Sequence, residues 1–373
     1  GKNIDGQELY TIMVRAKEVG MGTGVITNSS ITDATPATFL SHITNRYSFV
    51  GVTRDFPESN VDFIAGGGLI SVLPENSREY FDGIDALNME PELVGPEETL
   101  PMLLEMGYET YLGLEGSLSM RSELAEGTYD PEKLINLFTG CIMPFEYYKF
   151  KSTTTTKYDD VPSLVEMTQA GIESLSQNEN GFVMMIEAAL IDKCGHKFSQ
   201  EMAVYQVNLL NNVLKELMEF YNEHPYETLI ILTADHETGN YAYNDELLSE
   251  WKSQAPFTWT DDGKEMASFA SEEWGVSSYS ENLQTQINIA NVGRWETEAE
   301  NRTRLYTALT MDIAKECGTK IRTSDHSGQL VPLFIIGTGS EQFDGKTHIK
   351  EIPITICELM GWEALPEVIT PDN

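Results

Sequence analysis

The sequence predicts an α/β protein: a three-layer α/β/α sandwich around a large, mostly parallel central sheet, with a cap-like insertion. Residues 182–186 and 228–232 are unbroken apolar runs, typical of strands that are covered on both faces. Residues 201–221, between them, are predicted to form a helix. This β-α-β order favours a parallel sheet between two layers of helices.

Two helices and one strand are predicted in the N-terminal region. Residues 8–18 have an amphipathic helical pattern that ends near Gly20, a residue type common at helix C-termini. Residues 24–27 are a short apolar strand candidate. Thr35 is followed by Pro36, and threonine suits the N-cap while proline suits the first helical position. A second helix is therefore predicted to begin at Thr35.

Further elements follow the same alternation. Residues 61–65 are apolar and end in three glycines, which predicts a strand. Residues 163–177 repeat apolar residues at helical spacing. Near the C-terminus, residues 331–337 are predicted to form a strand and residues 354–360 a helix.

Residues 241–322 differ in character from the rest. They contain four of the five tryptophans and few strand signals. We expect an insertion or cap within a single domain that spans residues 1–373. The threonine tract 153–156 is predicted to be an exposed loop.

The charge balance is strongly acidic. Against 59 acidic residues there are 24 basic ones, a formal net charge of −35. Such a surface repels nucleic-acid backbones, so DNA and RNA are excluded as expected partners. No apolar run has the length of a membrane span. The four cysteines form no C-x-x-C pair and are compatible with two disulfides or with buried thiols.

Oxygen and nitrogen ligand types follow the ends of three predicted strands. Asp33 and Thr35 follow the first, and Glu187 follows the second. Asp192 and His196 come next, at a spacing that puts both on one helix face, and Asp235 and His236 follow the third strand. Because ligands bind outside the carboxyl ends of parallel strands, we expect these residues to gather at one sheet edge.

The residue types separate into two kinds of metal site. Imidazole with carboxylate suits zinc, which favours Asp192, His196, Asp235 and His236 as its ligands. Asp33, Thr35 and Glu187 offer only oxygen, which suits magnesium. Taken alone, Asp235 with His236 is more often a capped turn, and Asp192 with His196 an ordinary surface pair. Glu187 is harder to dismiss, because a carboxylate ending a buried strand needs a partner.

Four segments together resemble the alkaline phosphatase family, in its order. They are Asp33-Ala-Thr-Pro-Ala with His42 and Arg46, the run from Ile186 to His196, Leu232-Thr-Ala-Asp-His-Glu-Thr-Gly, and Asp325-His-Ser-Gly. By this resemblance Asp192, His196 and His326 bind one Zn²⁺, and Asp235 and His236 bind a second. The resemblance assigns Thr35 and Glu187 to one Mg²⁺, with Asp33 either a third ligand or holding the waters of that ion. It assigns Arg46 to phosphate, and Lys193 to phosphate through a water molecule.

The assignment of Arg46 sets a geometric condition. A straight helix from Thr35 to Arg46 would separate them by about 16 Å. We therefore expect the helix to end early, or the long arginine side chain to reach back.

The resemblance implies hydrolysis of small-molecule phosphate monoesters through a phosphoserine intermediate. It also implies a periplasmic or secreted location and allows a homodimer. No Asp-Ser-Ala motif, which carries the nucleophile in this family, occurs in the sequence. We expect the sequence to be part of a longer active enzyme. The alternatives are a truncated homologue that binds metal or phosphate without turnover, and a phosphodiesterase, sulfatase or phosphomutase on the same scaffold. A metal-storage or adhesion module is the alternative outside this class.

Overall fold

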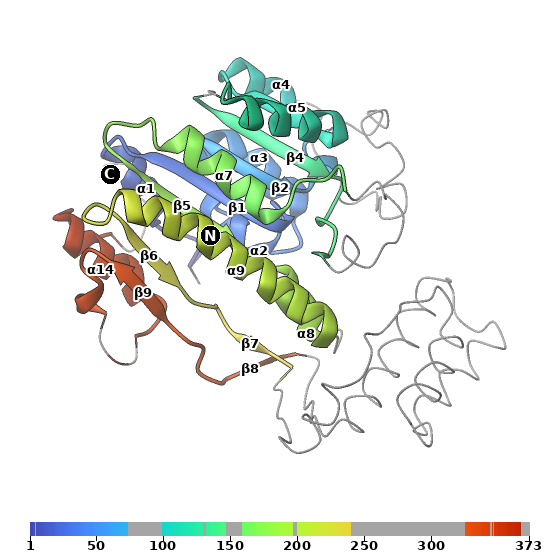
Figure 1. Cartoon of the computed structure of the whole chain (residues 1–373). Coiled ribbons are helices and arrows are strands. Elements are labelled where there is room, and N and C mark those ends of the chain that lie inside the picture. The colour runs from blue at the N-terminus through green and yellow to red at the C-terminus, as the bar shows by residue number, and fades with distance from the viewer. Residues whose placement is uncertain are drawn as a thin grey trace, which may run out of the picture. The chain divides into compact units, whose positions relative to one another are not determined.

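The computed structural model describes residues 1–3, 5–73, 99–129, 132–146, 159–196, 200–239, 325–343, 345 and 347–366 (Figure 1). The predicted insertion and the threonine tract lie outside these ranges. The chain divides into two compact units. The first comprises Gly1–Ala189, Gln206–Ile231 and Ile335–Asn373, and the second Leu190–Tyr205 and Leu232–Phe334.

A five-stranded parallel sheet forms the centre of the first unit. Its strand order is β3-β4-β2-β1-β5. The strands are β1 (Gly22–Ser30), β2 (Phe63–Gly67), β3 (Glu109–Leu112), β4 (Leu134–Thr139) and β5 (Phe182–Glu187). The predicted parallel sheet is confirmed. Since all five strands run the same way, their carboxyl ends lie at the same edge, where Thr27 of β1 is paired with Glu187 of β5.

Helices cover both faces of this sheet (Figure 1). One apolar cluster joins alternate strand residues such as Val25 to α1 (Ile12–Glu18), α2 (Ala34–Leu40), α3 (Phe49–Ser59) and α4 (Thr99–Glu105). The other joins the intervening residues, such as Ile26, to α5 (Gly113–Glu126), α7 (Leu164–Leu175) and α9 (Gln200–Glu223). Successive strand residues point to opposite faces, so the sheet is buried on both sides, as a three-layer sandwich requires.

Helix α7 begins where the sequence predicts it. The Ser163 hydroxyl accepts a hydrogen bond from the Glu166 amide, and the Glu166 carboxylate accepts one from the Ser163 amide. This capping box satisfies two amides that have no partner inside the helix. Burial alone would raise the pKa of Glu166, but the bonds from Arg121 and Ser163 outweigh it and lower the pKa.

Two other helices begin at different residues from those predicted. Helix α1 starts at Ile12, because the Thr11 hydroxyl accepts from the Val14 amide and ends the extended segment there. The prediction that Thr35 caps α2 is wrong. Asp33 is the N-cap and its carboxylate accepts from the Ala34 amide. Pro36 falls in the first turn, where its missing N–H costs no helical hydrogen bond.

The apolar strand β5 lies at an edge of the sheet. Its side chains are half-buried, although an unbroken apolar run predicts full coverage. Strands β6 (Leu229–Leu232) and β9 (Phe334–Gly337) form a separate two-stranded sheet. A short 3₁₀ turn, η1 (Leu69–Ser71), follows β2, a second, η4 (Ser340–Gln342), follows β9, and α14 (Glu351–Met360) comes last.

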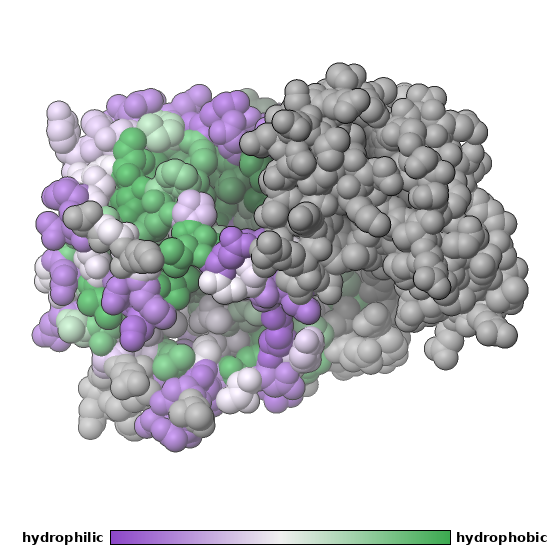
Figure 2. Space-filling view, turned by 90° about the horizontal axis from the view of Figure 1, so that it is seen from below, coloured by the Kyte–Doolittle hydropathy of each residue, from purple (hydrophilic) through white to green (hydrophobic). Residues whose placement is uncertain are grey.

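Apolar side chains are also exposed on the surface. Ile336 on β9 is 37% exposed, and Ile354 and Met360 on α14 are 46% and 49% exposed. The view from below shows hydrophobic areas among the hydrophilic ones (Figure 2). Acidic side chains therefore do not cover the described surface evenly. Among the described helices, none combines the length and apolar character that crossing a membrane requires.

A substitution at Gly67 tests how closely the chain packs at the end of β2. A Cβ atom there would lie 2.0 Å from the Cys141 carbonyl oxygen, which is backbone and cannot move aside easily. We expect Gly67→Ala to lower the free energy of unfolding by about 2–3 kcal/mol. Gly22→Ala is the matched control, because its Cβ would meet the movable Leu175 side chain at 3.3 Å. Thermal unfolding followed by circular dichroism compares them, and equal stabilities would contradict this description.

Candidate metal centre

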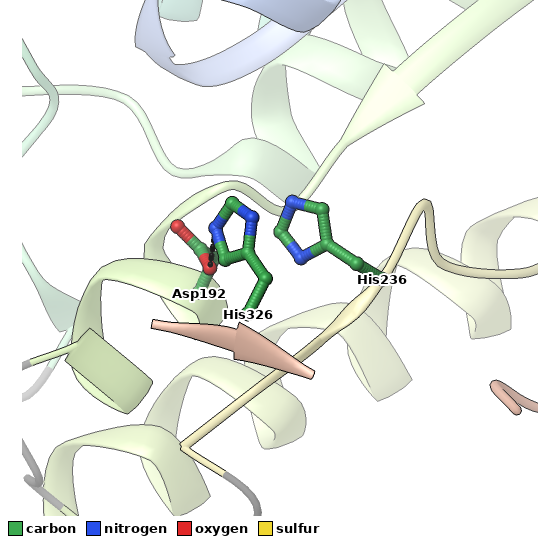
Figure 3. A group of neighbouring side chains, drawn as sticks. All are labelled: Asp192, His236 and His326. Atoms are coloured by element: carbon green, nitrogen blue, oxygen red, sulfur yellow. Dashed lines mark ion pairs between the residues drawn. The ribbon is translucent and has the colours of Figure 1, made fainter. Parts of the chain in front are cut away.

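Three short segments of the second unit carry the histidine cluster (Figure 3). Asp192 and His196 lie on α8 (Leu190–His196). His236 directly precedes β7 (Glu237–Thr238), and His326 begins β8 (His326–Ser327). Strands β7 and β8 are antiparallel, with Thr238 opposite His326. Helix α8 approaches β7 closely, since a Cβ on Gly195 would lie 3.0 Å from the Thr238 side chain.

The Asp192 carboxylate faces both His196 and His326. Its Oδ2 is 3.3 Å from Nε2 of His196, and its Oδ1 is 3.6 Å from Nε2 of His326. The two Nε2 atoms of His196 and His326 are 3.2 Å apart. The nitrogens and carboxylate oxygens of this group therefore face one another.

Asp235 and His236 form a second group beside the first. Asp235 Oδ2 is 3.0 Å from His236 Nε2. The rings of His236 and His326 are stacked, with centroids 3.4 Å apart. Ligand atoms of Asp192, His236 and His326 all lie within 4.8 Å of one another. The two ligand sets predicted from the sequence therefore adjoin through His326.

Thr238 also belongs to this site, although it was not predicted from the sequence. Its hydroxyl donates a hydrogen bond to Asp192 Oδ1 and lies 3.4 Å from His236 Nδ1. Since the single hydroxyl hydrogen goes to Asp192, Nδ1 of His236 is the donor to Thr238. This tautomer leaves the Nε2 lone pair of His236 free to bind a cation. In the sequence, Thr238 lies two residues after His236 and within the segment Leu232-Thr-Ala-Asp-His-Glu-Thr-Gly that resembles the family.

The oxygen-donor residues lie in the first unit. Asp33 caps α2, Thr35 lies in its first turn, and Glu187 ends β5. Helix α2 ends at Leu40, which confirms the expectation that it stops early. The chain then returns, so that Nη2 of Arg46 lies 3.2 Å from Asp33 Oδ1 with its side chain 53% exposed. Lys193 is half-buried on α8 of the second unit, next to Asp192.

Two hydroxyls beside the oxygen donors were also missed. Thr27 donates to Glu187, and Ser29 donates to Asp33. Both residues are buried in β1. Serine and threonine hydroxyls in a strand can bond to many different groups, so these partners are not predictable from the sequence.

Comparisons with known proteins show the family to which the chain is similar. The model of the alkaline phosphatase family matches residues 1–361. Alkaline phosphatase 3 of Bacillus subtilis (strain 168) is 27% identical over 364 residues, which cover 96% of this chain and 72% of that protein.

Solved structures show the same fold. A cold-active alkaline phosphatase from the psychrophile Shewanella sp. has a TM-score of 0.67 at 24% identity, covering 96% of this chain and 80% of its own. A TAB5 alkaline phosphatase with a histidine changed to aspartate and Mg bound in its M3 site has a TM-score of 0.62 at 23% identity. That match covers 97% of this chain and 79% of the TAB5 chain. Because the family model matches nearly the whole chain, the protein belongs to the alkaline phosphatase family, metal-dependent hydrolases of phosphate monoesters.

Proposed function

We propose that this protein hydrolyses phosphate monoesters with two zinc ions and one magnesium ion, through a phosphoserine intermediate whose serine is not in this sequence. Asp192, His196 and His326 would hold one zinc ion, and Asp235 and His236 would contribute to the second. Asp33, Thr35 and Glu187 would hold magnesium. Following the family, we also propose a periplasmic or secreted location.

The spacing of the ligand atoms carries the zinc proposal. Two ligands about 2.1 Å from a tetrahedral zinc ion lie about 3.4 Å from each other. The facing atoms of Asp192, His196 and His326 are 3.2, 3.3 and 3.6 Å apart. The facing atoms of Asp235 and His236 are 3.0 Å apart. Lone pairs this close repel one another unless a proton or a cation lies between them, so the residues fit the metal.

The oxygen donors support magnesium in the first unit. Asp33, Thr35 and Glu187 offer carboxylate and hydroxyl oxygens, the ligands that Mg²⁺ prefers. The TAB5 protein with Mg in its M3 site is a structural neighbour, which agrees with this choice. When bound, the metals would stabilise the negative charge that develops during phosphoryl transfer.

Arg46 and Lys193 would handle the phosphate itself. The planar guanidinium of Arg46 matches two phosphate oxygens, and Asp33 holds it by one nitrogen while half of the side chain stays exposed. Lys193 would act through a water molecule. In a chain of net charge −35, these cations would offset repulsion of the substrate dianion.

Hydrolysis of matched esters by the full-length protein tests the proposed reaction. We expect p-nitrophenyl phosphate to be cleaved far faster than the corresponding diester or sulfate ester. A zinc chelator should remove this activity, and zinc with magnesium should restore it.

His326→Ala should lose activity, whereas His348→Ala should keep it, because His348 lies in an exposed turn outside the cluster. Full activity with the chelator would exclude zinc, and preference for another ester would exclude the monoesterase assignment. Zinc binding without any hydrolysis would favour the non-catalytic alternative.

Thr238 provides a separate test of the zinc ligands. Thr238→Val keeps the shape of the side chain but removes the bond to Asp192. We expect it to weaken zinc binding about 10-fold, as the loss of a residue that orients a ligand typically does. Thr233→Val is the control, because its hydroxyl bonds to the Pro332 carbonyl and to no ligand. Titration against a chromophoric chelator measures both, and equal affinities would contradict the role given to Thr238.

A further inference from the structure

We propose that Thr27 and Ser29 are positioning residues for the magnesium site: their buried hydroxyls fix the carboxylates of Glu187 and Asp33 before the cation binds. This inference rests on the magnesium site of the proposed function. Both hydroxyls lie near the carboxyl end of β1, and all four residues belong to the first unit.

Thr27 holds Glu187 across the β1–β5 pair. The two residues are directly paired in the parallel register. The Thr27 hydroxyl accepts the Ser29 amide at 2.9 Å, so its single hydrogen is directed to Glu187 Oε2, 2.5 Å away. Thr27 is fully buried, which removes competition from water for this bond. The carboxylate therefore has one oxygen fixed by a strand of the central sheet.

Ser29 extends the same network to Asp33. Its hydroxyl donates to Asp33 Oδ2 at 2.9 Å, and it is also fully buried. The other oxygen, Oδ1, accepts the Ala34 amide at 2.9 Å and Arg46 Nη2 at 3.2 Å. Donors on both oxygens fix the plane of the Asp33 carboxylate.

One short stretch of β1 thus links the two carboxylates. The Ser29 amide bonds to Thr27, and the Ser29 hydroxyl bonds to Asp33. A cation site of fixed geometry binds more tightly than one whose ligands must first be oriented, since less rotational freedom is lost. A buried hydroxyl also needs a partner, and here both partners are carboxylates that the proposed function assigns to magnesium.

Magnesium binding to the full chain tests this role by isothermal titration calorimetry, with MgCl₂ as the titrant. We expect Thr27→Val to raise the dissociation constant for Mg²⁺ about 10–100-fold. Thr27→Ser retains the hydroxyl and should bind nearly as the unmodified chain does. Ser29→Ala should weaken binding about 10-fold. Ser30→Ala is the control, because the Ser30 hydroxyl bonds to Thr32 and to no carboxylate.

Glu187→Gln separates failure of this inference from failure of the proposed site. If the unmodified chain binds no Mg²⁺, or Glu187→Gln binds as tightly as it does, the magnesium site itself is wrong. If Glu187→Gln loses binding while Ser29→Ala and Thr27→Val keep it, the positioning role is wrong. Should Thr27→Val fail to fold by circular dichroism, the Ser29→Ala and Ser30→Ala pair decides. Equal weakening by both serine variants would also overturn the proposal, because it would show a general loss of packing.

Discussion

Parallel pairing of β1 with β5 is the interaction on which the oxygen-donor group of the first unit depends. It sets Thr27 opposite Glu187 and directs both strands to the same sheet edge. On its other side β1 pairs with β2, and Gly24, Val25 and Ile26 pair with both neighbours, so the backbone of β1 is fixed from two directions. The fixed end of β1 also determines where the residues that follow it lie. Asp33, three residues after β1, therefore both caps α2 and forms an ion pair with Arg46.

The histidine cluster of the second unit follows a different principle. It is assembled from a helix and two short antiparallel strands rather than from a broad sheet. Its acceptor atoms face one another at 3.0–3.6 Å, an arrangement that is unfavourable without a proton or metal between them. The close contact of Gly195 with Thr238 and the bond from Thr238 to Asp192 hold the segments in place. A cation site requires both closely spaced ligand atoms and contacts that keep them in position.

Local pattern was enough to predict the parallel sheet and several of its helices. The apolar run of β5 and the helical spacing of apolar residues in α7 both predicted the element type that the fold adopts. The predicted start of α2 is wrong, because Asp33 and Thr35 are both residue types that cap helices. The sequence alone does not show which of the two is the N-cap. Helix rise, together with the phosphate role that the resemblance assigns to Arg46, predicted that α2 ends early or that the arginine side chain reaches back, and α2 ends at Leu40.

The site was predictable only where ligands lie close in sequence or within a known motif. Asp192 with His196 and Asp235 with His236 met that condition, and His326 entered only through the resemblance to a family. Thr27 and Ser29 lie outside the quoted motifs, and Thr238 lies inside one of them without being recognised. A hydroxyl can bond to many partners, and only the folded chain determines which one it meets.

Anomalous X-ray diffraction at the zinc edge, on crystals grown with zinc and magnesium, tests the central claim most directly. The account predicts one zinc peak bound by Asp192, His196 and His326 and another bound by Asp235 and His236. Density without zinc anomalous signal should lie beside Glu187, Thr35 and Asp33. Absence of zinc from the histidine cluster, or a zinc peak at Glu187 in place of magnesium, would contradict the assignment of the metals.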